Sequence, residues 1–345
     1  MKKVLLFLSL VPLIYACTNK WGDNVKLISK TEVTYTDVEQ IYNYGEIALK
    51  PSEIIMCDSL LIILDQTPND ILKIYNINSG QTRSFVSQGR AKGEVLGAYD
   101  IDYIRETNEI AVLDVTTSTI LFCALDSIDV KEYYPNRSYN LMSSGFNLFT
   151  NVTIDGTSIY CSGCFDELRF FKYDMFNCKV IDSISYCPNA IGEDVDRYIN
   201  QAYMGTIQYN HATEKVVIGC RYADQLEIYD TRAKTVQYVK GPLLFEPDYH
   251  VVGTSTGQAL AHSEEERKGY IDIATNDHFI YALYSGRTRQ DGKSSYGNEI
   301  RKFTWEGEYV TSYMLNQDIL SFDADNSDQI YTINYNGEII QYALK

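Results

Sequence analysis

The chain has 345 residues, 45% of them hydrophobic, and its 46 acidic residues outnumber 30 basic ones, for a formal net charge of −16. The hydrophobic content excludes an intrinsically disordered chain, and the acidic balance argues against nucleic acid or an anionic membrane surface as a direct partner. The acidic residues are scattered rather than clustered, so the charge is most simply that of a solvated surface.

The first residues have the pattern of a secretion signal. A short basic start precedes the apolar run Val4–Ile14, which is shorter than the roughly 20 residues that a membrane-spanning helix needs. Ile14-Tyr15-Ala16-Cys17 follows at once and resembles a bacterial lipobox. We therefore predict a signal peptide over residues 1–16, a lipid-modified Cys17 and a tether over residues 17–24. Ordinary signal cleavage before an incidental cysteine is the alternative.

From residue 60 onward, a unit of two strands recurs along the chain. A continuous apolar strand, as expected where both faces are covered, is followed by a strand in which apolar and polar residues alternate. The apolar strands are Leu60–Leu64, Ile110–Leu113, Ser158–Cys161, Val216–Ile218, Ile280–Leu283 and Ile330–Ile333. Their alternating partners are Asp70–Asn76, Thr119–Phe122, Glu167–Phe171, Gln225–Asp230, Glu299–Phe303 and Glu338–Tyr342. The apolar strands begin 48 to 64 residues apart.

A period near 50 residues with about four short strands per repeat is typical of a β-propeller. Outer strands are predicted after several partners, at Thr82–Val86, Thr235–Val239 and Tyr309–Tyr313. The last repeat ends after its third strand, so we expect the N-terminal region Val25–Tyr35 to supply the missing strand and close the ring. The sequence thus predicts an all-β, six-bladed propeller as one domain over residues 25–345.

The cysteines do not indicate a disulfide framework. Of the eight, seven remain if Cys17 is lipidated, so at least one is unpaired. The pair Cys161-Ser-Gly-Cys164 has redox spacing, but it lies where a strand runs into a turn rather than at the helix start that lowers a thiol pKa. We expect a local disulfide or plain packing there, ahead of redox catalysis.

Three features resemble a known family. Ser87-Gln-Gly-Arg-Ala-Lys-Gly-Glu94 is similar to a glycine-rich G-x-G-x-G-E segment, and Ile280-Tyr-Ala-Leu-Tyr-Ser-Gly-Arg287 and the lipobox accompany it. Together they resemble the Bacteroidetes envelope lipoproteins that carry a TolB-like six-bladed propeller, over nearly the whole mature chain. Ala91 and Lys92 stand where that family often has Gly-Pro. The resemblance implies a lipid-anchored propeller of the cell envelope. Thr18-Asn-Lys-Trp21 lacks the acidic run associated with surface export in these bacteria, so we expect an outer-membrane anchor that faces the periplasm.

No catalytic or metal-binding pattern is evident. His211, His250, His262 and His278 show no short ligand spacing, and no serine lies in a G-x-S-x-G elbow. We therefore predict no catalytic residue, no metal ligand and no cofactor. Propellers bind ligands through loops at the mouth of the channel. Arginine and tyrosine side chains expected on such loops, which would suit a carboxylate or a sugar, are Arg90, Arg221, Tyr222, Tyr284, Arg287 and Arg289. The alternative for Arg221 and Arg287 is structural, each tying a turn to the next blade.

These observations favour a non-catalytic binding module that recognises an envelope protein or carbohydrate. Its only membrane contact would be the N-terminal lipid, and nucleic acid is not expected as a partner. The competing hypothesis is a metal-assisted lactonase or lyase with its site in the central channel.

Overall fold

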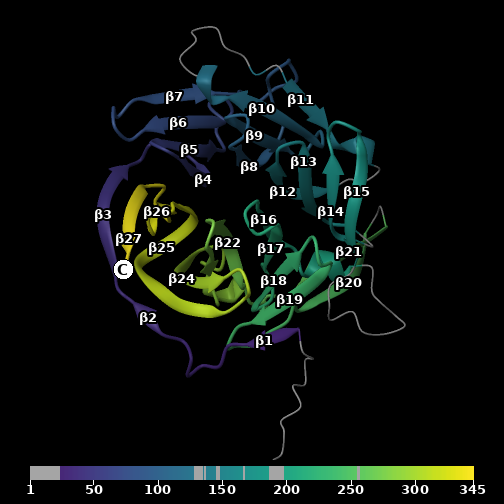
Figure 1. The fold of residues 1–345 in the computed structure, drawn as a ribbon, viewed down its shortest axis with the longest axis vertical. Helices are drawn as coiled ribbons and strands as arrows, with labels where there is room; N and C mark the ends of the chain where they lie inside the picture. Colours follow the sequence, from purple (N-terminus) through teal and green to yellow (C-terminus); the bar gives the residue numbers. More distant parts are fainter. Residues whose placement is uncertain are drawn as a thin grey trace, which may run out of the picture.

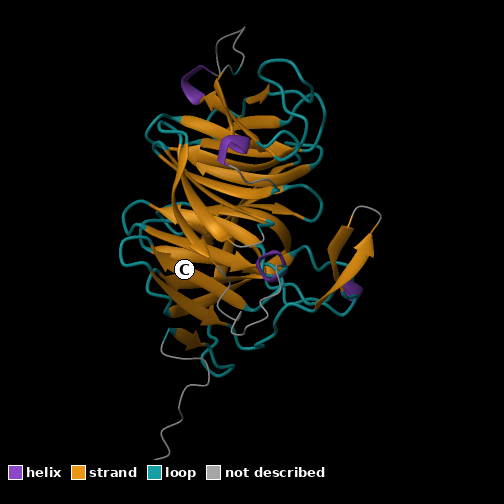
Figure 2. Cartoon of the chain, turned by 90° about the vertical axis from the view of Figure 1, so that its right-hand side faces the viewer, coloured by secondary structure: helices purple, strands orange, loops and turns teal. Residues whose placement is uncertain are grey.

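The computed structural model describes residues 24–127, 135, 137–144, 148–165, 168–185, 198–254 and 257–345. Within them, antiparallel sheets are arranged as blades around a central channel (Figure 1). Seen from the side, the molecule is built of strands with only short helical turns (Figure 2). The predicted signal peptide, Cys17 and the tether up to residue 23 lie outside the described residues, and so does Cys187.

The first three blades follow one another along the chain, each with its first strand at the channel. Blade 1 consists of β4 (Pro51–Cys57), β5 (Leu60–Asp65), β6 (Leu72–Asn76) and β7 (Thr82–Phe85). Blade 2 consists of β8 (Ala98–Ile104), β9 (Glu109–Asp114), β10 (Thr119–Ala124) and β11 (Arg137–Asn140). Blade 3 consists of β12 (Phe149–Asp155), β13 (Ser158–Gly163), β14 (Leu168–Asp174) and β15 (Lys179–Ser185).

The other three blades complete the ring and include one shared strand. Blade 4 consists of β16 (Gly205–Asn210), β17 (Lys215–Cys220), β18 (Gln225–Asp230) and β19 (Thr235–Lys240). Blade 5 consists of β22 (Tyr270–Thr275), β23 (Phe279–Tyr284), β24 (Gly297–Thr304) and the first part of β25 (Tyr309–Ala324). Blade 6 consists of the last part of β25, β26 (Gln329–Asn334), β27 (Ile339–Leu344) and β3 (Val38–Gly45).

The remaining elements decorate this ring. They are β1 (Val25–Leu27), β2 (Tyr35–Thr36), β20 (Tyr249–Thr254), β21 (Gly257–His262), α1 (Ile199–Ala202) and the 3₁₀ turns η1 (Leu125–Ser127), η2 (Leu141–Ser144) and η3 (Arg289–Asp291). Strands β20 and β21 pair only with each other, and the hairpin stands apart from the stacked blades in Figure 2. Among the described residues, no helix has the length and apolar character that a bilayer crossing demands.

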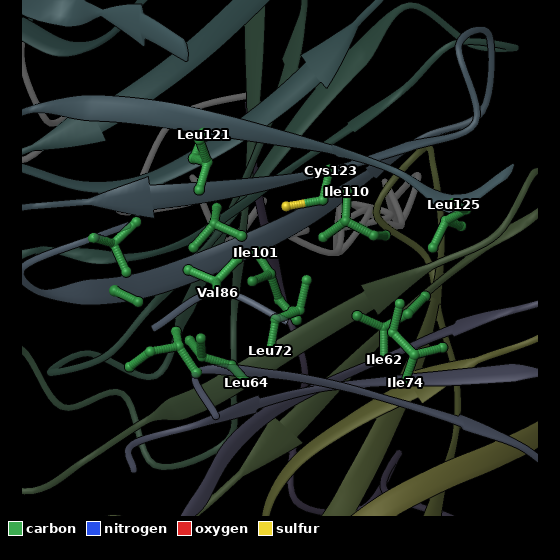
Figure 3. Packing of buried hydrophobic residues seen from close by; sticks show 14 of the residues in the cluster. Ile62, Leu64, Leu72, Ile74, Val86, Ile101, Ile110, Leu121, Cys123 and Leu125 are labelled. Carbon is green, nitrogen blue, oxygen red and sulfur yellow. The ribbon is translucent and has the colours of Figure 1, made fainter. Parts of the chain in front are cut away.

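The predicted all-β propeller of six blades is confirmed. Each predicted apolar strand is the second strand of its blade, as β5 illustrates, whose residues from Leu61 to Leu64 are 0% exposed. They are apolar on both faces because neighbouring blades cover both sides. Between blades 1 and 2, side chains such as Ile62, Leu72, Ile101 and Ile110 form one buried cluster (Figure 3). Burying each such side chain stabilises the fold by about 1.5–3 kcal/mol.

The ring is closed by an N-terminal strand, as predicted, but by a later segment than Val25–Tyr35. Strand β3 pairs antiparallel with β27, from Val38 opposite Leu344 to Gly45 opposite Ile339. The predicted region instead supplies two short parallel additions, because β1 joins the outer edge of β19 and β2 lies along β25. Strand β3, which is followed directly by β4 of blade 1, therefore covers the free edge of β27.

Candidate functional site

The wall of the central channel is formed by the innermost strands β4, β8, β12, β16, β22 and the last part of β25 (Figure 1). These strands run in the same direction through the ring, since each follows the outer strand of the blade before it along the chain, with the β20–β21 hairpin inserted before β22, or, in β25, continues from it. Acidic side chains project from four of them and reach the next blade. They are Glu53, Asp100, Asp102, Asp272 and Asp323.

These carboxylates connect neighbouring blades by accepting backbone hydrogen bonds. Asp100 Oδ2 accepts from Val152 N at 2.7 Å, joining blades 2 and 3, and Asp323 Oδ2 accepts from Met56 N at 2.7 Å, joining blades 6 and 1. Similar bonds run from Ile101 N to Glu53, from Ile154 N to Asp102 and from Phe322 N to Asp272. The innermost strands lack a partner strand on the channel side, and at four of the six blade junctions these carboxylates bind them side chain to backbone.

Burial in the channel wall disfavours the charged form of these carboxyl groups. It raises the pKa of Asp100 to about 7, of Asp272 to about 6 and of Asp323 to about 7. It also raises the pKa of Glu53 and Asp102 well above the usual range, and the neighbouring Asp100 carboxylate adds to the effect at both. Near neutral pH the wall is therefore partly protonated.

The channel widens into a cavity at each end. The small cavity, of about 220 Å³, is lined by Glu53, Tyr99, Asp100, Arg221, Lys268 and Asp272, among others. The large cavity, of about 830 Å³, is lined by later residues of the same strands, including Cys57, Asp102 and Asp323. Because the innermost strands are aligned, the two cavities occupy opposite mouths of the channel. We call the face around the small cavity the small-cavity face.

Three loops meet at the small-cavity face and are held there by backbone hydrogen bonds. Gly269 N donates to Arg221 O at 2.8 Å, and Lys268 N donates to Arg287 O at 2.9 Å. Gly269 is required for this approach, because a Cβ at that position would lie 2.0 Å from Ala223 O. Arg289 N donates to Glu266 O at 3.2 Å and secures the third contact. The loops after β17, before β22 and after β23 therefore present their side chains together.

Three of the predicted ligand-binding residues gather here. Arg221 lines the small cavity, Tyr222 stacks on His262 with ring centroids 4.2 Å apart, and Arg289 is exposed close by, since its charge influences both Tyr222 and Lys268. Among the described residues, no ion pair or side-chain hydrogen bond is made by the guanidinium of Arg221. Arg221 therefore connects the loops through its backbone carbonyl, in agreement with the structural alternative, while its guanidinium group remains available to bind a ligand.

The other predicted residues do not join this group. Tyr284 does not project from a loop: it is 4% exposed, and the guanidinium of Arg301 lies 3.5 Å from its ring centroid. Arg287 pairs with Asp318 at 2.5 Å, which ties the β23–β24 loop to β25, in agreement with the structural alternative. Arg90 is exposed on the loop between β7 and β8 and does not line either cavity.

Lys268 belongs to the site but was not predicted from the sequence. Its ammonium group lies 5.4 Å from the Tyr222 ring centroid and donates to Ser295 Oγ at 3.3 Å. Burial, with the charges of Arg221 and Arg289, lowers its pKa to about 8, while Glu266 acts in the opposite direction. The only sequence signal for Lys268 is its place directly before Gly269 and β22, and a single lysine before a strand is too common to indicate a site.

A second group of side chains lies at the large cavity. Glu106, Asp155 and His211 come from the equivalent first turns of blades 2, 3 and 4. Each offers one oxygen or nitrogen atom that could bind a metal ion, and these three atoms lie within 4.8 Å of one another. The distances along the chain hide this group, because it takes blade geometry to bring residues about 50 positions apart together. Two of the three side chains are exposed, and His211 Nδ1 is hydrogen-bonded to Asp155 at 2.9 Å.

The cysteine pair is resolved in favour of plain packing. Cys161 and Cys164 are free thiols, with Cys161 fully buried at 0% exposure. Burial raises the pKa of both thiols, so neither is poised as a thiolate for redox chemistry. The expected local disulfide is not formed.

Known proteins that are similar to this chain include several solved structures and one protein family. Solved structures similar to the chain include the WD40 repeats of RRP9 (TM-score 0.49, 8% identity, covering 91% of this chain and 99% of that chain) and the β-propeller domain of Myceliophteria thermophila Cps50 (Swd1) (TM-score 0.49, 10% identity, 89% and 100%). No functionally curated protein matches the sequence. The model of the TolB-like 6-blade propeller-like family matches residues 29–327, most of the chain. The protein therefore belongs to the TolB-like six-bladed propeller family.

Proposed function

We propose that this protein is a non-catalytic binding module of the cell envelope and that it recognises its partner through the small-cavity face. The observation that carries the proposal is the convergence of Arg221, Lys268 and Arg289 beside Tyr222 and the exposed Tyr99. Cationic and aromatic groups presented together on a rigid scaffold are typical of recognition sites. The interblade hydrogen bonds supply the rigidity, so that little ordering is required when a partner binds.

The family and the N-terminal sequence support the proposed location. TolB-like propellers are associated with the periplasm and the envelope. The apolar run Val4–Ile14 followed by Ala16-Cys17 supports a lipoprotein of the Bacteroidetes envelope type, anchored through Cys17 to the outer membrane and facing the periplasm. The partner would then be an envelope protein or carbohydrate. The net charge of −16 favours neither nucleic acid nor an anionic bilayer surface.

Site-specific photo-cross-linking in intact cells tests this proposal. A photoreactive phenylalanine analogue would replace Tyr99 or Arg289 on the small-cavity face, or Asn326 at the large cavity as the matched control. We expect one reproducible higher-mass adduct from the first two positions and none from the control. Adducts from Asn326 alone, or equally from all three positions, would show that recognition does not occur at this face.

A further inference from the structure

We propose that the small cavity binds a small zwitterionic molecule, with its anionic group on Arg221 and Lys268 and its ammonium group on the carboxyl groups of Glu53, Asp100 and Asp272. This inference goes beyond the proposed function, because it adds a small-molecule site in the cavity of the face that would recognise an envelope partner. Two observations carry it: an unpaired cationic rim and an acidic floor that line one cavity.

The rim of the cavity has an excess of positive charge. Lys268 is close enough to Arg221 and Arg289 for both charges to disfavour its ammonium form. The charge of Glu266 opposes this effect at Lys268, but its Oε1 already pairs with His262 Nδ1 at 2.5 Å. The guanidinium of Arg221 has no ion-pair partner in the described part of the chain. An anionic group that bridges Arg221 and Lys268 relieves this repulsion and forms charge-assisted hydrogen bonds.

The floor of the same cavity is acidic. Glu53, Asp100 and Asp272 project from the innermost strands of three different blades and line the cavity together. Glu53 accepts from Ile101 N, Asp100 from Val152 N and Asn151 Nδ2, and Asp272 from Ile273 N, Phe322 N and Ser321 Oγ. Each carboxylate offers about four acceptor positions, so acceptor positions remain on all three. An ammonium group has three donors and a full positive charge, which matches a set of converging carboxylates.

The two charged zones are arranged in depth. Arg221 directly follows β17 and Lys268 lies two residues before β22, so both belong to loops at the mouth. Glu53, Asp100 and Asp272 lie within β4, β8 and β22, one step further into the channel. A ligand therefore enters with its ammonium group inward and its anionic group outward. A cavity of about 220 Å³ suits a small molecule rather than a polymer segment.

Titration of the two zones predicts a bell-shaped pH dependence of binding. The pKa of Asp100 is raised to about 7 and that of Asp272 to about 6, chiefly by burial. The charges that interact with these two carboxyl groups are Glu53, which faces Asp100, and Arg221 and Asp323, which interact with Asp272. Below pH 6 the floor is protonated and attracts an ammonium group weakly. Above pH 8, Lys268, which faces Arg221, Arg289 and Glu266, loses its charge. Affinity is therefore highest between about pH 6 and 8, and binding releases protons there.

Isothermal titration calorimetry on the full chain tests the inference. The probes are glycine, 4-aminobutyrate and 6-aminohexanoate, each compared with analogues of equal length that carry only the carboxylate or only the amine. We expect at least one ω-amino acid to bind tenfold more tightly than both of its single-charge analogues. Its binding enthalpy should vary with the ionisation enthalpy of the buffer, because protons leave the carboxyl groups.

Variants separate the two ends of the site. Arg221→Met should weaken binding of the ω-amino acid tenfold or more but leave the affinity of the amine analogue unchanged. Asp272→Asn, which keeps a hydrogen-bond acceptor, should also weaken binding of the ω-amino acid but leave the affinity of the carboxylate analogue unchanged. Arg105→Met, at the large cavity, is the matched control and should change neither affinity. Melting curves confirm that each variant is folded.

Two outcomes overturn the inference. One is that a single-charge analogue or a neutral sugar binds as tightly as every ω-amino acid; the other is that no probe binds at all. Either result leaves the proposed function standing if cross-linking still occurs from Tyr99 and Arg289. Loss of that cross-linking removes the proposed function itself, so the two failures are distinguishable.

Discussion

At the scale of single residues, the carboxyl groups of the channel wall contribute most to the stability of the ring when they are protonated. Asp323 accepts from Met56 N of blade 1, yet burial raises its pKa from 3.8 to about 7. The folded state therefore holds the proton to a higher pH than the unfolded chain does. Its contribution to stability is fully present below about pH 4 and is lost as pH rises through 7.

Replacing Asp323 by Asn should flatten this pH dependence. The amide oxygen still accepts from Met56 N, but no charge is buried, so the variant should gain about 1 kcal/mol or more relative to the wild type between pH 5 and pH 8. Urea unfolding at several pH values measures the difference. Asp37→Asn, at an exposed position, is the control and should follow the wild type. Parallel stability curves for Asp323→Asn and the wild type would contradict the assignment.

A buried ion pair between blades 3 and 4 is another residue-scale determinant of stability. Arg169 is 2% exposed, and its Nε donates to Glu227 Oε2 at 2.8 Å. Arg169→Met should destabilise the protein by about 3–5 kcal/mol, because it leaves the Glu227 charge buried without its partner. The double variant Arg169→Met/Glu227→Gln should recover part of that loss in urea unfolding. A single variant as stable as the double one would show that the pair has no such role.

At the scale of elements, closure of the ring depends on β3. Without it, the edge of β27 would expose unpaired backbone groups. Deleting residues 24–46 should lower the melting temperature by about 10 °C or more and promote aggregation. Deleting only residues 24–37 removes β1 and β2 but keeps β3, and it should have a much smaller effect. Thermal melts with light scattering compare the two. Equal destabilisation by both deletions would contradict a closing role specific to β3.

The elements also show how far the sequence predicts the fold. The second and third strands were predictable because burial on both faces leaves continuous apolar runs such as Val216–Ile218. The innermost strands were not, because the polar side chains that face the channel, as in β8, interrupt the apolar pattern. Strand β3 is mostly exposed and has no core-facing signature, so its place is decided by the free edge of β27 rather than by its own residues.

At the scale of the whole molecule, the ring brings together residues that the sequence keeps apart. Arg221, Tyr222 and Arg289 were predictable as loop residues, but their grouping with Lys268 depends on backbone contacts between loops of blades 4 and 5. The acidic floor was not predictable at all, because single acidic residues in strands resemble surface positions until the blades are placed around an axis. The overall acidic composition therefore gives no indication of the cationic and aromatic side chains that gather at the small-cavity face.

The most direct test of recognition at this mouth is the affinity of the partner recovered by cross-linking, measured for three forms of the protein. These are the wild type, Arg221→Ala/Lys268→Ala on the small-cavity face, and Arg105→Ala/His211→Ala at the large cavity. We predict at least a tenfold rise in Kd for the first variant, about 1.4 kcal/mol, and less than a twofold change for the second. Unchanged affinity in the first variant, or a loss confined to the second, would contradict the account.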